Sequence, residues 1–366
     1  MNKKIICLTI FFGILTCTST IVMGQYLSLN PAELEKLIGL IKTDSSAQKE
    51  FLLLEQQAKT ALLQEPLPIE IIISEGHLAS DPKKIKTLKS LADLKKIYSL
   101  AYTYKITNHK DYLTKCTQYI TAWAKINKAI ANPINNTKLD PLFEAYDLIK
   151  DEVNESDKQV IEKWFRQIAD VEIATRRVLA GKRLSYNNWN SHKIKIVANI
   201  AYLLNDKNYQ LFVDTSLRKQ IALNLYADGS GADFKERDAL HYHYYTLEPL
   251  LTTATIIRRA TGINYYSYLS DSGSSVEKSV AFLAPYARGE KTHAEFVNSK
   301  VAFDRKRAQN KEADYIIGAY FNPKKAIDVF ISAAYFNPNY LSIVTKLSEK
   351  PAKYANWQCV LNSVKK

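Results

Sequence analysis

The fold of this chain is decided by the stretch Asp81-Pro-Lys-Lys-Ile-Lys-Thr-Leu-Lys-Ser-Leu-Ala-Asp-Leu-Lys-Lys-Ile-Tyr-Ser-Leu-Ala-Tyr102. An aspartate followed by a proline is typical of a helix N-terminus, because the carboxylate caps free backbone N–H groups and proline suits the first turn. Apolar residues then recur every three or four positions, which is the spacing of one face of an α-helix. We therefore expect a long helix, whose apolar face consists of Ile85, Leu88, Leu91, Leu94, Ile97, Ala101 and Tyr102.

Helical spacing of this kind recurs along the rest of the chain. Ser156 and Gln159 have the spacing of a capping box, and Gly262 is suited to end a helix. The clearest strand signal, Pro68–Ile73, stands alone, so the chain is predicted to be all-α. Further apolar helical faces are formed by Leu113, Cys116, Ile120 and Trp123, by Val160, Ile161, Trp164 and Ile168, by Leu217, Ile221 and Leu225, and by Leu250, Ile256 and Ile257.

The length of the chain limits how these helices can be arranged. With 366 residues, an all-helical chain exceeds the size at which a single compact core usually stops growing. Helical hairpins arranged in a ring avoid this limit, since each hairpin packs mainly on its neighbours. We expect a single domain over residues 25–366, folded as an incomplete α/α toroid, which is a barrel of helical hairpins. A solenoid of helical repeats is the alternative, but the sequence contains no fixed-period repeat.

The first 24 residues have the pattern of a secretory signal peptide. Lys3 and Lys4 precede the mostly apolar stretch 5–22, and the small residue Gly24 follows it. An uncleaved membrane anchor is the alternative, because the apolar stretch approaches the length that spans a bilayer. We expect a secreted or periplasmic protein whose mature part has no membrane span. Cys116 and Cys359 would remain in it, as one disulfide or as two buried thiols.

The charge of the chain favours an acidic partner. The sequence contains 50 Lys+Arg against 37 Asp+Glu, a formal net charge of +13. A surplus of this kind attracts nucleic acids, anionic lipids or acidic polysaccharides. Because export separates the protein from nucleic acid, an acidic polysaccharide is the expected partner. The 23 tyrosines also suit a sugar groove, since each combines an apolar ring with a hydroxyl group.

The first segment of chemical interest is Leu184-Ser-Tyr-Asn-Asn-Trp-Asn-Ser-His192. Asn187 and Asn188 stand where a loop is expected to enter a helix, and asparagine is a common N-cap. On a helix that begins there, Asn188 and His192 are four residues apart and share a face. Taken alone, the segment is ordinary, and a helix cap with a structural histidine is the favoured explanation.

The second segment is Asp228-Gly-Ser-Gly-Ala-Asp-Phe-Lys-Glu-Arg-Asp-Ala-Leu-His-Tyr-His-Tyr-Tyr245. On a continuous helix, Arg237, His241 and Tyr245 lie at i, i+4 and i+8 and form one polar stripe. His241 and His243 would diverge, so we expect no metal site there. An aromatic helix with core tyrosines is the alternative, but the density of titratable groups favours a functional site.

Together, in this order and spacing, the two segments resemble the alginate-lyase superfamily of polysaccharide lyases. The resemblance covers about residues 80–260 and rests on Asn187-Asn188-Trp189 and on Arg237 followed by His241-Tyr242-His243-Tyr244-Tyr245. It implies an incomplete α/α toroid and a secreted location. It also implies cleavage of a uronic-acid polymer, glucuronan or alginate-like, by β-elimination without a cofactor.

The resemblance also implies a role for each residue. In β-elimination a base removes the C5 proton of a uronate, an acid protonates the departing O4, and hydrogen-bond donors neutralise the adjacent carboxylate. By resemblance, Asn188 is the neutraliser, assisted by Arg237. His192 is a base or a second neutraliser, and Tyr245 is the acid and also a candidate base. Substrate contacts are then expected from Asn187, Trp189, His241, Tyr242, His243 and Tyr244.

The chain departs from the family pattern in two places. Family 5 alginate lyases have a histidine directly after the two asparagines, where this chain has Trp189. The Arg-to-Tyr spacing also differs by one, which leaves Tyr242 and Tyr244 as alternative acids and His241 or His243 as alternative bases. The displaced histidine is more similar to the family 38 branch, which acts on glucuronan or alginate-like chains.

Two other functions remain open from the sequence. A glycoside hydrolase on a similar toroid would need a carboxylate pair, and a non-catalytic sugar-binding protein would need only aromatic and basic contacts. The candidate carboxylates of the hydrolase are Asp228, Asp233, Glu236, Asp238 and Glu248.

A third segment of interest is Lys291–Lys300 with Asp304, Arg305 and Arg307. It is either a source of substrate contacts or a solvated loop.

Overall fold

The computed structural model describes residues 26–175, 186–349 and 353–365. The predicted signal peptide lies outside these ranges. Within them the chain is helical and contains no strand, only two isolated β-bridges, which confirms the all-α prediction. No helix in the described ranges has the length and apolarity needed to cross a membrane.

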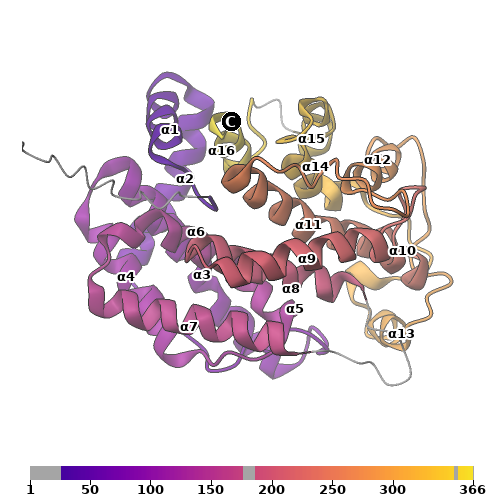
Figure 1. Ribbon diagram of the computed structural model, residues 1–366, viewed down its shortest axis with the longest axis horizontal. Helices are drawn as coiled ribbons and strands as arrows, with labels where there is room; N and C mark the ends of the chain where they lie inside the picture. Colours follow the sequence, from indigo (N-terminus) through magenta and orange to yellow (C-terminus); the bar gives the residue numbers. More distant parts are fainter. Residues whose placement is uncertain (1–25, 176–185, 350–352, 366) are drawn as a thin grey trace, which may run out of the picture.

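The helices form two layers of an incomplete α/α toroid (Figure 1), as predicted. Within the described ranges, five helices pack in succession as the inner layer, and a second set packs on their outer side. The inner helices are α3 (Pro82–Thr107), α6 (Asp140–Ile149), α8 (Asn188–Leu203), α11 (Leu240–Thr261) and α14 (Ile327–Ala333). The outer helices are α2 (Ser45–Leu62), α4 (Lys110–Ile126), α7 (Glu155–Ala174), α9 (Lys207–Asn224), α12 (Val276–Ala287) and α15 (Leu341–Ser348).

Shorter elements complete the arrangement. Helices α1 (Pro31–Thr43) and α16 (Trp357–Val364) come from opposite ends of the sequence and pack side by side (Figure 1). The remaining α-helices are α5 (Pro133–Asn136), α10 (Ala232–Arg237) and α13 (Ala302–Gln309). The 3-10 helices are η1 (Thr137–Leu139), η2 (Lys150–Glu152), η3 (Ala313–Tyr315), η4 (Pro323–Ala326) and η5 (Pro338–Tyr340).

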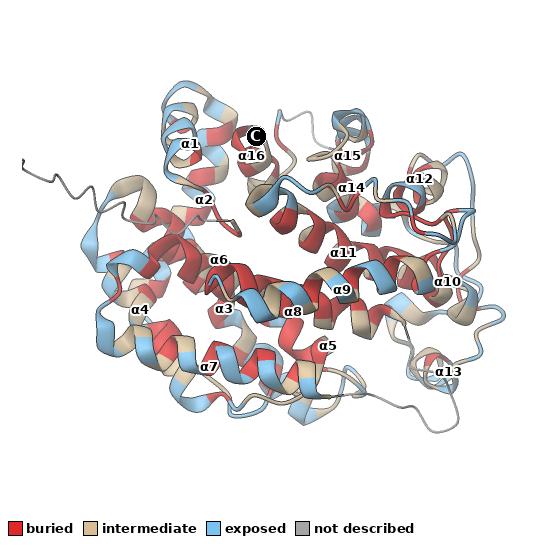
Figure 2. Ribbon diagram, in the orientation of Figure 1, coloured by how far each residue is buried: buried red, intermediate tan, exposed pale blue. Residues whose placement is uncertain are grey.

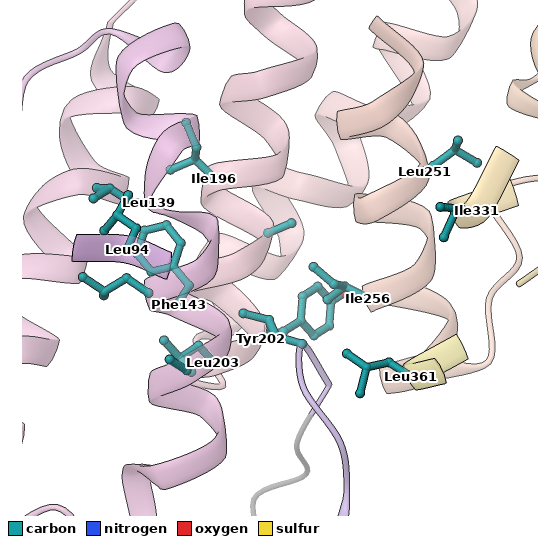
Figure 3. Close-up of a cluster of buried hydrophobic side chains, with 14 of the residues drawn as sticks. Leu94, Leu139, Phe143, Ile196, Tyr202, Leu203, Leu251, Ile256, Ile331 and Leu361 are labelled. Carbon is teal, nitrogen blue, oxygen red and sulfur yellow. The ribbon is translucent and has the colours of Figure 1, made fainter. Parts of the chain in front are cut away.

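The core lies between the two layers and along the inner helices. Buried residues run along α8 and α11, whereas α7 and α9 present exposed faces (Figure 2). Each of the five inner helices contributes to one buried apolar cluster (Figure 3), and burial of this kind is the main favourable term in folding. One member from each inner helix, in order, is Leu94, Phe143, Ile196, Leu251 and Ile331.

Local signals placed several helix ends correctly. Asp81 caps α3 by accepting from the Lys83 N–H, and Gly262 ends α11 with a φ of 78°. The apolar face of α3 is buried only in part, however, because Ile85 and Leu88 are 55% and 51% exposed. Burial along this face becomes continuous only towards its middle, where α3 packs on α6.

Two local predictions were wrong. Residues 68–73 form no strand, because no second strand is available to pair with them; the Lys128 N–H donates to the Glu70 carbonyl instead. The capping box at Ser156 is also absent, because α7 starts two residues earlier than that cap would place it, at Glu155. Asn154 is the cap, and its side chain accepts from the Asp157 N–H.

The N-terminal segment is held to α11 by a buried ion pair. The Arg259 guanidinium binds both carboxylate oxygens of Glu33 at 2.7 Å and also donates to the Tyr26 and Ser28 carbonyls. This bidentate pair joins α11 to the N-terminal segment.

Cys116 and Cys359 are both buried and free, so the possible disulfide is not formed.

Candidate active site

The two segments selected from the sequence meet where α8 packs on α11. Asn187 is the N-cap of α8, and its Oδ1 accepts from the Trp189 N–H at 3.1 Å. The predicted loop-to-helix transition is therefore confirmed at the predicted residue. Asn187 and Trp189 are half-buried at this helix end, while Asn188 and His192 are buried on the same helix.

His192 and Tyr245 face each other across the α8–α11 contact. Their ring centroids are 4.5 Å apart and their planes are inclined by 48°. His192 is 2% exposed, whereas Tyr245 is half-buried and reaches solvent. The arrangement places an imidazole and a phenol within one small volume.

The surroundings of His192 favour the neutral imidazole. Burial lowers the pKa of His192 well below its ordinary value, and the positive charges of Lys195 and Lys138 lower it further. Its Nδ1 lies 2.9 Å from Thr137 Oγ1, and its Nε2 makes no hydrogen bond. If Nδ1 carries the proton and donates it to Thr137, Nε2 keeps its lone pair, although this atom is buried and lies next to the backbone of Tyr245.

The surroundings of Tyr245 favour the protonated phenol. Burial raises the pKa of the Tyr245 phenol, and the carboxylate of Glu248 raises it further. Glu248 lies three residues later on α11, so the two side chains share a helical face. A neutral imidazole beside a protonated phenol is a suitable pair of base and acid.

Asn188 is fixed by a buried carboxylate. Asp233 Oδ1 accepts from the Asn188 backbone N–H at 3.0 Å and from its side-chain Nδ2 at 2.6 Å. Asp233 Oδ2 accepts from Asn224 Nδ2 and from Thr246 Oγ1, both at 2.8 Å. Asp233 therefore joins α8, α9, α10 and α11, and it sets the orientation of the Asn188 amide.

The predicted stripe of Arg237, His241 and Tyr245 on one helix is wrong. Arg237 ends α10, Asp238 adopts the left-handed conformation with a φ of 47°, and α11 begins only at Leu240. The helix restarts because Glu295 accepts from the free N–H groups of Leu240 and His241 at 2.8 and 2.9 Å. Sequence spacing assumed a continuous helix and could not include this distant cap.

Arg237 still belongs to the same region through other contacts. Its Nε donates to Asp304 Oδ2 at 2.7 Å, and its Nη2 donates to Asp304 Oδ1 and, at 2.6 Å, to the Tyr242 hydroxyl. The Arg307 guanidinium also donates to that hydroxyl, at 3.1 Å. The Tyr242 hydroxyl thus accepts from two guanidinium groups, and Asp304 balances the charge of Arg237.

The two histidines of α11 lie in different surroundings. His241 is half-buried among aromatic rings, and its Nδ1 is 3.3 Å from the Tyr244 hydroxyl. His243 is buried between α10 and α12, and its Nε2 lies 3.0 Å from the Ser279 carbonyl. Burial lowers the pKa of each to about 4. The structure therefore places His241, but not His243, with Tyr245 and Tyr242.

The third segment acts as a support for α11. Besides the cap by Glu295, the Phe296 N–H donates to the Asp238 carbonyl at 2.7 Å, and the Lys300 N–H donates to the Glu236 carbonyl. The Phe296 ring lies 6.2 Å from that of His241. This segment consequently holds the α10–α11 junction in place, and its role in substrate contact stays a prediction.

Sequence reasoning missed Thr137, Lys138 and Lys195, which surround His192. Lys195 forms an ion pair with Asp140 of α6, and its position three residues after His192 could have indicated it. Thr137 and Lys138 come from a distant segment, and no local signal points to them. Within the described ranges, no three His, Cys, Asp or Glu side chains are grouped closely enough to hold a metal ion.

The architecture is that of an α/α toroid, in which a histidine and a tyrosine face each other between two inner helices. The alginate lyase family model matches residues 42–293. The chain therefore belongs to the alginate lyase family, and it is a polysaccharide lyase. Comparison with curated protein sequences found no match.

Solved structures show the same fold. An alginate lyase from Bacteroides ovatus superposes with a TM-score of 0.66 at 16% identity, covering 90% of this chain and 97% of the other. Alginate lyase A1-III from Sphingomonas species A1 gives a TM-score of 0.53 at 17% identity, covering 84% and 95%. A tyrosine-to-phenylalanine variant of A1-III, complexed with a tetrasaccharide, gives a TM-score of 0.54 at 16% identity, covering 74% and 80%.

Proposed function

We propose that the protein is exported and cleaves a polyuronate, alginate or glucuronan, by β-elimination at His192 and Tyr245. The observation that carries this proposal is the contact between the two rings, with centroids 4.5 Å apart. Family membership supports the reaction class, and the tetrasaccharide complex of A1-III shows that a relative binds an oligosaccharide. The displaced histidine supports a substrate range that includes glucuronan.

The proposed reaction assigns one proton transfer to each ring. Nε2 of neutral His192 takes the C5 proton, the C4–O4 bond breaks, and a C4–C5 double bond forms. The Tyr245 hydroxyl gives its proton to O4 of the leaving sugar chain. The imidazolium and phenolate that remain exchange a proton, directly or through water, which restores the starting state.

The carboxylate beside C5 must be neutralised for this proton to leave. We assign this role to the Asn188 amide, because Asp233 fixes its orientation by taking one of its two N–H donors. Arg237 is assigned to support, since Asp304 and Tyr242 already take hydrogen bonds from its guanidinium. His241 and Tyr244 are assigned to substrate contact at the edge of the site.

Four of the five candidate carboxylates of the hydrolase alternative can be placed relative to the site. Asp233 already accepts four hydrogen bonds, Asp228 accepts from the Ser230 hydroxyl and N–H, and Asp238 accepts from Asn298. Glu248 is the candidate carboxyl that lies near Tyr245, and a hydrolase needs two such groups.

Incubation with alginate and with polyglucuronate tests the function. We expect products with a C4–C5 double bond, detected as new near-ultraviolet absorbance. Saturated reducing ends without that absorbance would indicate hydrolysis, and no cleavage of either polymer would contradict the proposal. Detection of the protein in the periplasm or medium, with its N-terminus near Gln25, tests the export.

A further inference from the structure

A second group of polar and aromatic side chains lies along the inner helices, next to the candidate active site. Lys195, one helical turn after His192, forms an ion pair with Asp140 of α6. Glu144 follows Asp140 by four residues, so both side chains share a face of α6 and are about 6 Å apart along its axis. Glu144 is therefore the next carboxylate after Asp140 along this face of α6.

Glu144 is held by two groups and remains accessible. The Tyr102 hydroxyl donates to its Oε1 at 2.6 Å, and the Lys365 ammonium lies 3.9 Å from the same oxygen. The Glu144 side chain is 21% exposed. A carboxylate has about four lone-pair positions, so Glu144 keeps the capacity to accept further hydrogen bonds from a ligand.

Two half-buried aromatic rings contact Tyr102, whose hydroxyl donates to this carboxylate. The fully buried Tyr102 ring has Tyr98 on one side, with centroids 4.7 Å apart, and Trp357 of α16 on another, at 5.7 Å and 84°. Tyr98 and Trp357 are each partly exposed, unlike Tyr102. Aromatic surface beside a fixed polar group is typical of a site that binds a small polar ring.

We propose that Tyr98, Trp357 and Glu144 form a distal sugar-binding site for the polymer that is cleaved at His192 and Tyr245. A pyranose presents its C–H face to the aromatic rings and a hydroxyl group to Glu144. The negative charge of Glu144 selects the hydroxyl edge of the sugar over its carboxylate edge. This inference rests on the proposed function.

The distal position leads to a dependence on chain length. Binding energy from remote parts of a substrate contributes to turnover, so it is lost when the substrate is too short to reach the site. Tyr98→Leu should lower kcat/KM for a long polyuronate about fivefold to tenfold, the size of one aromatic contact. For the shortest oligouronate that is still cleaved, kcat/KM should change by less than about twofold.

Two further variants separate binding from folding. Glu144→Gln keeps an acceptor for the Tyr102 hydroxyl and should show the same selective loss on long chains. Tyr209→Leu is the matched control, because the Tyr209 hydroxyl donates to Asp170 at 2.6 Å on the outer helices α9 and α7. Thermal unfolding of each variant checks that it is folded.

The outcomes are distinct. Equal losses on short and long substrates, or no loss on either in both variants, would overturn the distal site while leaving the lyase activity established. If the wild-type protein cleaved no polyuronate, the proposed function itself would fail, and the distal site with it.

Discussion

The imidazole of His192 on α8 faces the phenol of Tyr245 on α11, with ring centroids 4.5 Å apart. Burial acts on the two groups in opposite senses: the pKa of His192 falls and that of Tyr245 rises. At neutral pH the first group can accept a proton and the second can donate one. This division of roles is a consequence of packing, since both rings have ordinary titration behaviour in water.

Removal of the Tyr245 hydroxyl should abolish most turnover. We expect Tyr245→Phe to lower kcat about 10²- to 10⁴-fold with little change in KM, because the ring remains but the proton donor is lost. Steady-state kinetics on the preferred polyuronate measure this, with Tyr209→Phe as the control. Near-normal activity of the variant would transfer the acid role to Tyr242 or Tyr244.

Glu248 should make substrate binding depend on pH near neutrality. Burial, together with the nearby charge of Asp328, raises the pKa of Glu248 to about 7, against the opposing effect of Lys195 and Lys138. Below that pH the carboxyl is neutral; above it, its charge repels an anionic polymer. The wild-type KM should rise about threefold to tenfold between pH 6 and pH 8, and Glu248→Gln should remove the rise. Glu277→Gln, on α12, should leave it unchanged. An identical pH dependence of KM in wild type and Glu248→Gln would disprove this role.

Asp233 should be essential for both stability and activity. In Asp233→Asn an amide N–H₂ replaces an oxygen that accepts hydrogen bonds, so donors face donors in a buried site. We expect a loss of about 2–4 kcal/mol in the free energy of unfolding and a lower kcat, because the Asn188 amide loses its orientation. Denaturant unfolding measures the first effect, with exposed Asp271→Asn as the control; equal stabilities would refute it.

The buried histidines should destabilise the fold in acid. The pKa of His243 is lowered by burial to about 4, so below its ordinary pKa of 6.5 the unfolded chain binds a proton that the folded chain does not. Stability therefore falls as the pH decreases from 6.5, by about 2 kcal/mol at pH 5 for this residue. In His243→Gln, whose amide can still donate to Ser279, the fall between pH 7 and pH 5 should be smaller by that amount. The exposed variant His109→Gln should lose as much stability between pH 7 and pH 5 as the wild type. If His243→Gln also lost as much stability as the wild type over this range, His243 would not be the cause.

Much of the fold could be predicted because its signals are local. The caps at Asp81 and Asn187, the stop at Gly262 and the apolar helical faces depend on interactions within about one turn of the chain. Local signals gave a wrong helix cap at Ser156, because Asn154, two residues earlier, caps α7 instead. They also gave a wrong strand at residues 68–73, because no second strand is available to pair with this segment.

The helical class, the family motif and the two segments that bear His192 and Tyr245 could all be recognised from the sequence. The groups that surround these two residues become visible only in the folded chain. Thr137 reaches His192 from a segment 55 residues away, Asp304 neutralises Arg237 from 67 residues away, and Glu295 interrupts the helical stripe from a distant segment. Such pairs form because burial makes an unpaired polar group costly, and which partner satisfies it depends on how the helices pack rather than on spacing along the chain.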